Sequence, residues 1–122
     1  MREITFKAKD VNNKWVYGFY TNNEGSDHYI LQQSTIGLLW VEIYSPTLGQ
    51  YTGMEDKYGN SIYEGDIIKC NKFYKESSLP HQGIVVYNND YCTYATKNEQ
   101  GTTVFMHLDL DSIEVIGNIH DK

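Results

Sequence analysis

The stretch Pro46–Lys69, PTLGQYTGMEDKYGNSIYEGDIIK, decides the fold that this sequence predicts. Glycine recurs in it at intervals of six residues, at Gly53, Gly59 and Gly65. A chain that reverses repeatedly uses glycine where φ is positive or where a Cβ has no room. The corner Glu64-Gly65-Asp66 then leads directly into the apolar pair Ile67-Ile68. The stretch therefore predicts short strands joined by tight turns.

Three segments of this stretch resemble the signature of the YopX family, small proteins that bacteriophages and prophages encode. They are residues 49–54 (GQYTGM), 56–60 (DKYGN) and 62–68 (IYEGDII). Residues 1–8 resemble the usual opening of the family and residues 114–119 its usual close, so the resemblance spans the chain. Two positions depart from the pattern, because the family usually has Leu in place of Met54 and often Asn-Gly in place of Tyr58-Gly59. The resemblance implies a mainly β fold with a C-terminal part similar to an SH3-like barrel, and it implies no particular biochemical activity.

The pattern of the remaining segments is also that of a mainly β protein with little helix. Apolar and polar residues alternate at residues 4–9, and a turn at residues 10–14 joins this segment to a second strand at 15–20. Further strands are expected at 28–32 and 38–44, the second of them buried, and from the central stretch onward at 66–71, 83–87, 91–96, 102–110 and 113–119. We therefore predict a single domain over residues 1–122, with an N-terminal β region at 1–45 and the glycine-rich stretch and SH3-like barrel at 46–122.

Composition limits the classes of function. The chain has 10 basic and 16 acidic residues, a net charge of −6, and one arginine, Arg2. Nucleic-acid binding depends on Lys and Arg that neutralise phosphates, so this balance disfavours it. An alternative, a nucleic-acid-associated SH3-like protein, has the cluster Lys69, Lys72 and Lys75 in its favour. No apolar run approaches the 18 residues of a membrane span, and the first residues do not form a secretory signal.

The two cysteines, Cys70 and Cys92, are too few for a small secreted domain held by disulfides, so we expect the cytoplasm of a bacterial host. Core packing is the default role for both residues. A reactive cysteine needs a neighbouring base, and sequence alone does not place one beside either thiol. No nucleotide-binding loop or hydrolase motif is present. We therefore expect no catalytic residues and no cofactor.

Two acidic clusters are candidate metal sites. In the first, Glu64 and Asp66 are close in sequence to Glu55 and Asp56, and such a corner is the basis of a further alternative, a metal-dependent hydrolase. The preferred interpretation is structural: Asp66 accepts hydrogen bonds from turn amides. In the second, His107, Asp109 and Asp111 share one side of an expected strand, and the preferred interpretation is a solvated strand face with a His–Asp neighbour pair. We assign no metal site to either cluster.

The preferred explanation of the 11 tyrosines is the high β-propensity of Tyr. The alternative is a recognition surface, because Tyr combines an apolar body with a polar tip. The polar segment 72–81 carries two further aromatic residues, beside the expected barrel. We predict a non-enzymatic protein-interaction module of phage or prophage type that binds an unidentified host or phage protein, and the edge strands permit a homo-oligomer. The predicted binding residues are Tyr51, Tyr58, Tyr63, Phe73 and Tyr74. The predicted structural corner consists of Gly53, Gly59, Tyr63, Glu64, Gly65 and Asp66.

Overall fold

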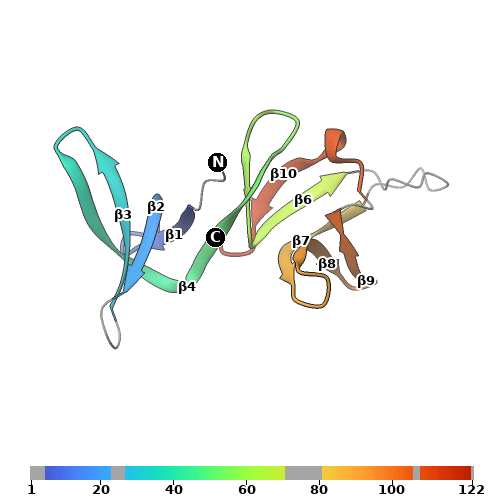
Figure 1. Cartoon of the computed structure of the whole chain (residues 1–122), viewed down its shortest axis with the longest axis horizontal. Coiled ribbons are helices and arrows are strands. Elements are labelled where there is room, and N and C mark those ends of the chain that lie inside the picture. The colour runs from blue at the N-terminus through green and yellow to red at the C-terminus, as the bar shows by residue number, and fades with distance from the viewer. Residues whose placement is uncertain (1–4, 23–26, 71–80, 106–107, 122) are drawn as a thin grey trace. The chain divides into compact units, whose positions relative to one another are not determined.

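The computed structural model describes residues 5–22, 27–70, 81–105 and 108–121 (Figure 1). The predicted β fold is confirmed, because the strands in these residues form two antiparallel sheets. Contacts divide the chain into two compact units, Met1–Gly53 and Met54–Lys122. The expected internal boundary lies between residues 45 and 46, whereas the contacts divide the chain after Gly53.

The first unit is built from four strands whose pairing closes on itself. They are β1 (Phe6–Asp10), β2 (Trp15–Asn22), β3 (His28–Ser34) and β4 (Gly37–Glu55). Each strand pairs antiparallel with the next, and β1 also pairs with β4. The side chains inside this ring form the core of the unit, with Ala8, Val16, Ile30 and Ile43 buried at its centre. These residues alternate with outward-pointing ones along each strand, as the two-residue period of a β-strand requires.

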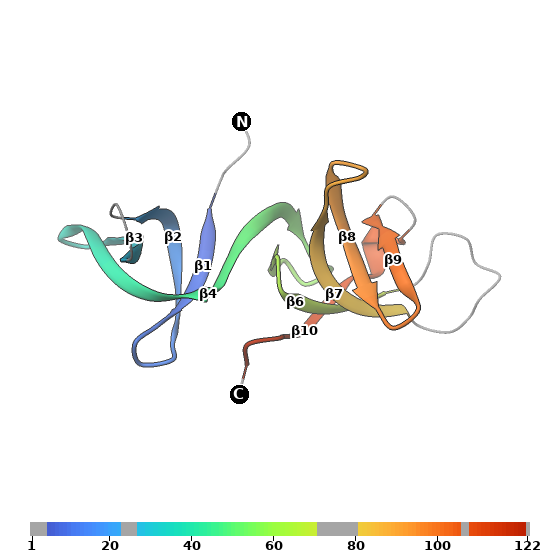
Figure 2. The ribbon, with the colours of Figure 1, turned by 90° about the horizontal axis from the view of Figure 1, so that it is seen from below.

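The strand β4 is much longer than predicted and bends along its length (Figure 2). The strand predicted at residues 38–44 continues through Pro46, and the ladder between β1 and β4 is irregular there. At this bulge the Thr47 hydroxyl replaces the missing backbone partners: it accepts from the Lys9 N–H at 2.8 Å and donates to the Tyr44 carbonyl at 2.6 Å. A proline is tolerated in a strand at such a bulge.

The second unit contains a five-stranded antiparallel sheet in the order β10-β6-β7-β8-β9. Its elements in chain order are β5 (Ser61–Tyr63), which pairs with β4, then β6 (Asp66–Cys70), β7 (His81–Asn88), β8 (Thr93–Asn98), β9 (Gly101–Val104), the 3-10 helix η2 (Leu110–Ser112) and β10 (Glu114–Asn118). The five sheet strands follow the predicted order of strands and connections. Their closure into an SH3-like barrel stays a prediction.

One predicted strand of this unit, residues 102–110, is too long. β9 ends at Val104, and the Leu108 N–H donates to the Phe105 carbonyl at 2.9 Å. Asp109 then caps η2, because its side chain accepts from the Asp111 N–H at 3.2 Å. Phe105 and Leu108 pack in the core beside Ile62, Ile68, Val85 and Ile113. Leu110 lies in η2 and is 40% exposed, so the 3-10 helix adds no side chain to this core.

The spacing of the three central glycines is explained by backbone conformation, because φ is 88° at Gly53, 85° at Gly59 and 90° at Gly65. Side chains other than glycine rarely adopt these angles. The Gly65 backbone also joins neighbouring elements: its N–H donates to the Val85 carbonyl at 2.9 Å, and its carbonyl accepts from the Ile119 N–H at 3.0 Å. The corner after β5 is thus held against β7 and the end of β10.

Candidate interaction surface

One side of the sheet in the first unit carries large apolar side chains that stay exposed. The register places Phe19 opposite Leu31, and Leu31 opposite Trp40, so these three residues form a row across β2, β3 and β4. We call this side the aromatic face. Its most exposed large residues have between 50% and 64% of their surface accessible, and they are Tyr17, Phe19, Leu38, Trp40 and Tyr44.

The aromatic face corrects the prediction that residues 38–44 form a buried strand. Ile43 is buried and faces the core, whereas Leu38, Trp40 and Tyr44 point to the opposite side and are exposed. Apolar residues on both faces of a strand are typical of burial between two layers, but this sheet has a core on one side only. Residues 15–20 likewise have no clearly polar face, a pattern shared by strands buried on both sides and strands with an exposed apolar side, so the sequence alone does not reveal the aromatic face.

Aromatic contacts order the face. The Tyr29 and Trp40 rings meet edge to face, with their centroids 5.5 Å apart. Beside Tyr17 and Tyr44, the Trp15 ring lies near two ammonium groups: Lys7 Nζ is 4.5 Å and Lys9 Nζ 5.2 Å from its centroid. Edge-to-face pairs and cation–π contacts hold aromatic rings in defined orientations. The face is therefore a pre-ordered surface.

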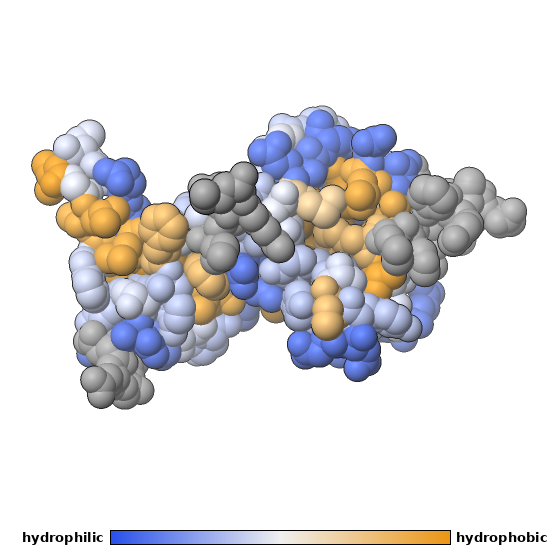
Figure 3. Space-filling model, viewed as in Figure 1, coloured by the Kyte–Doolittle hydropathy of each residue, from blue (hydrophilic) through white to orange (hydrophobic). Residues whose placement is uncertain are grey.

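The exposed area of this face is large for a protein of this size. An aromatic side chain covers about 150–250 Å², so five half-exposed residues leave roughly 400–600 Å² accessible. The largest apolar patch on a typical monomer is about 300–600 Å², and such patches are often functional. A standard protein interface buries about 800 Å² on each partner. Figure 3 shows apolar surface gathered along the hairpin of β3 and β4.

The residues predicted to bind a partner are placed differently from one another. Tyr58 is 67% exposed in the turn between β4 and β5. Tyr51 is half-buried in β4, and its N–H donates to the Thr5 carbonyl at 2.7 Å. Tyr63 is buried, with 8% of its surface accessible, so its ring is not part of the exposed surface. Phe73 and Tyr74 lie outside the described residues. Tyr51 and Tyr58 belong to different units of the chain.

The Asp66 carboxylate of the acidic corner accepts hydrogen bonds that hold the corner in place. Asp66 is buried, and its two carboxylate oxygens have different partners: Oδ2 accepts from the Tyr63 N–H at 2.8 Å, and Oδ1 accepts from the Asn118 side-chain amide at 2.9 Å. Asp66 therefore fixes the corner and connects it to the end of β10. Glu64 is half-buried beside it.

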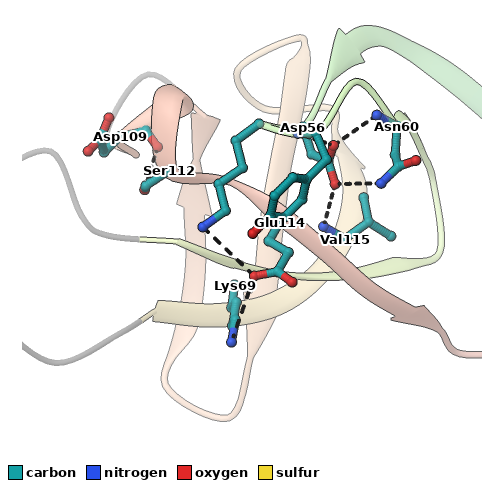
Figure 4. A network of polar contacts seen from close by, with 9 residues as sticks. Asp56, Asn60, Lys69, Asp109, Ser112, Glu114 and Val115 are labelled. Atoms are coloured by element: carbon teal, nitrogen blue, oxygen red, sulfur yellow. Dashed lines mark hydrogen bonds and ion pairs between the residues drawn. The ribbon is translucent and has the colours of Figure 1, made fainter.

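Asp56 has a similar arrangement in the turn between β4 and β5 (Figure 4). Its Oδ1 accepts from the N–H groups of Tyr58 at 2.9 Å and Asn60 at 2.8 Å, which shapes the turn. Its Oδ2 accepts from the Asn60 side-chain amide at 3.2 Å and from the Val115 N–H of β10 at 3.0 Å. Burial raises the pKa of this carboxyl, but the hydrogen bonds from Val115, Asn60 and Tyr58 outweigh it and hold the pKa below its ordinary value of 3.8.

The two cysteines differ in environment. Cys70 is buried, and burial, together with the negative charge of Asp109, raises the pKa of its thiol to about 11. This thiol is protonated at neutral pH and is a poor nucleophile. Cys92 is exposed in the turn between β7 and β8, where φ is 51°. Within the described ranges, no group of three or more His, Cys, Asp or Glu side chains is arranged to hold a metal ion, and His107 lies outside those ranges.

Within residues 5–22, 27–70, 81–105 and 108–121, no helix has the length and apolar character needed to cross a membrane. A comparison with curated proteins gives no match. Among solved structures, the crystal structure of protein EF1440 from Enterococcus faecalis is similar to this chain, with a TM-score of 0.57 and 22% sequence identity over 98% of this chain and 95% of that one. At this identity the similarity shows the fold alone. A family model described as "YopX protein" matches residues 1–122, and the chain therefore belongs to the YopX family.

Proposed function

We propose that this chain is a non-enzymatic, phage- or prophage-type interaction protein that binds another protein through the aromatic face of its first unit, in the cytoplasm of a bacterial host. The observation that carries the proposal is the set of five large residues, at least half exposed, on one side of a single sheet. Tyr and Trp are enriched in the interface residues that contribute most to binding, because they bury much apolar area while losing few rotamers.

Charge supports a protein partner over a nucleic acid. The first unit, residues 1–53, contains 4 Lys and Arg and 5 Asp and Glu, which gives a net charge of −1. Stacking surfaces for single-stranded nucleic acids combine aromatic side chains with a cationic groove. Here Lys7 and Lys9 are buried against Trp15, so they present little surface to a phosphate chain.

The test compares two double variants in affinity capture from lysate of the bacterial host, with and without nuclease. F19A/Y44A removes two rings from the aromatic face. The matched control Y58A/Y91A removes two exposed tyrosines of the second unit, one of them a predicted binding residue. We expect wild type and Y58A/Y91A to retain the same stoichiometric, nuclease-resistant protein and F19A/Y44A to lose it. The affinity of the captured protein is then measured by calorimetry, where a loss of at least tenfold is expected for F19A/Y44A alone.

Equal retention by all three proteins contradicts the assignment of the surface, and loss by Y58A/Y91A alone moves the binding surface to the second unit. Retention that disappears with nuclease supports the nucleic-acid alternative. Far-UV circular dichroism of both variants shows whether the sheet is intact, so that unfolding is not mistaken for lost binding.

A further inference from the structure

The hairpin formed by β3 and β4 extends beyond the strands that flank it. The pairing of β2 with β3 ends at Leu31, and the pairing of β1 with β4 begins at Ile43. Between these limits β4 pairs with β3, from Gly37 opposite Ser34 to Glu42 opposite Tyr29. In the part of the chain that the structure describes, the other edge of residues 37–42 has no strand beside it. Figure 1 shows this hairpin projecting from the rest of the first unit.

The hairpin lacks the features that normally protect a free edge. From His28 to Val41 the sequence has no Lys, Arg, Asp, Glu or Pro. Its apolar residues are exposed at the tip and on both sides, with 84% of the surface of Ile36 and 41% of that of Leu39 accessible, in addition to Leu38 and Trp40 on the aromatic face. Natural proteins protect exposed edges with charges, proline or bulges, because a bare edge is a template for another strand. A two-stranded hairpin alone is also only marginally stable.

We propose that a second copy of this chain covers this edge, so that the two β4 strands pair antiparallel about a two-fold axis perpendicular to the sheet. The sequence is self-complementary in the register centred on Leu39. Leu38 then lies opposite Trp40 of the other copy, which is an apolar–aromatic pair of the kind that stabilises sheets. Leu39 lies opposite Leu39 on the other side, and the two Glu42 carboxylates lie at opposite ends, so like charges do not meet.

The axis keeps the aromatic faces of both copies on the same side, so the dimer joins them into one continuous surface instead of covering them. The dimer is thus independent of the proposed partner binding and compatible with it. The paired edge is short and smaller than the roughly 800 Å² per partner of a standard interface. Isologous pairing of this size gives a reversible dimer that depends on protein concentration.

Sedimentation velocity of the wild-type protein between about 1 and 200 µM tests the proposal, since weak interfaces dissociate within this range. We expect the mass to rise from that of the 14.1 kDa monomer towards twice that value. L39K places a charge in the centre of the paired edge and should keep the protein monomeric. I116K is the matched control, because Ile116 is 45% exposed in β10 of the second unit, and it should dimerise like wild type.

Disulfide trapping keeps the test decisive if L39K fails to fold. Residues opposite each other in an antiparallel pair have Cα atoms about 4.5–5.5 Å apart, which suits a disulfide. In a C92S background, L39C should form a cross-linked dimer under mild oxidation, and I116C should not. A wild-type protein that stays monomeric at every concentration, equal dimerisation of L39K and I116K, or equal cross-linking at both positions overturns the proposal. F19A/Y44A should dimerise normally, which separates this result from the outcome of the partner test.

Discussion

Removing the Asp56 side chain should destabilise the second unit by about 3 kcal/mol, which can be estimated from the partners of its two oxygens. Loss of Oδ1 frees the N–H groups of Tyr58 and Asn60, which lie in an exposed turn and regain water, at a cost of about 1 kcal/mol. Loss of Oδ2 leaves the half-buried Val115 N–H without its acceptor, and a hydrogen bond to a charged group is worth about 1.5–3 kcal/mol.

The assay is thermal unfolding of wild type, D56A and D56N. For a domain of this size, about 3 kcal/mol lowers the melting temperature by roughly 12–24 °C. D56N should fall between the other two proteins, because its amide oxygen can still accept from the turn while its NH₂ group faces the Val115 N–H. Far-UV circular dichroism reports both units, whereas tryptophan emission reports the first, since Trp15 and Trp40 both lie there.

D10A is the matched control. Asp10 also shapes a turn, accepting from the N–H groups of Asn12 at 2.8 Å and Lys14 at 3.0 Å, but both partners are local and exposed. Its removal should cost about 1 kcal/mol or less. If D56A costs no more than D10A, the reasoning about the bond to Val115 is refuted.

Acid should remove the same contribution. The pKa of Asp56 is lower in the folded protein than its ordinary value of 3.8, so folding favours the ionised carboxylate. Its contribution is complete at pH values above the unfolded pKa and is lost as the pH falls through the folded pKa. The difference in stability between wild type and D56A should therefore stay constant from neutral pH down to about pH 5 and shrink below pH 4. A difference that shrinks near neutral pH would contradict this assignment.

The remaining predictions concern a close backbone approach and the two thiols. A Cβ added at Gly18 would meet the Leu31 carbonyl oxygen at 2.1 Å, so G18A should lower stability by about 3 kcal/mol or more in urea unfolding followed by tryptophan emission. Gly37 is also at positive φ, but an added Cβ there would meet open space, so G37A should lower stability by only about 1 kcal/mol. Equal losses of stability in G18A and G37A would show that the structure relieves the clash at Gly18. A thiol reagent at neutral pH should modify Cys92 quickly and Cys70 only on unfolding, and rapid modification of both would contradict the burial and raised pKa of Cys70.

The turns were the most predictable part of this fold. Glycine at positive φ and a turn between β7 and β8 are local requirements, so residue identity alone indicates them. The exact bounds were missed, because this turn occupies residues 89–92 and the strand predicted at 91–96 begins at Thr93. The course of β4 through Pro46 was not predictable, because the Thr47 hydroxyl that replaces its ladder bonds acts on β1, which is distant in sequence.

The exposed side of the first sheet was missed for a different reason. The apolar run 38–44 has the same composition whether its second face meets a core layer or water, and only the tertiary arrangement decides between them. The predicted tyrosines were chosen by residue type and loop position. Tyr63 shows the limit of this choice, because a buried ring and an exposed ring are identical in sequence.

The two structural aspartates also influence when each part of the chain can fold. Asp56 accepts a hydrogen bond from the Val115 N–H, 59 positions later in the chain. Asp66 accepts one from the Asn118 side-chain amide, 52 positions later, and both partners lie in β10. At a synthesis rate of about 5–20 residues per second, the hydrogen-bond partner of each aspartate is therefore synthesised roughly 3–12 s after the aspartate itself. The strands of the first unit are complete by then, so it can fold while the second unit is still open. Pairs this distant in sequence slow folding, and the second unit should be the slower of the two.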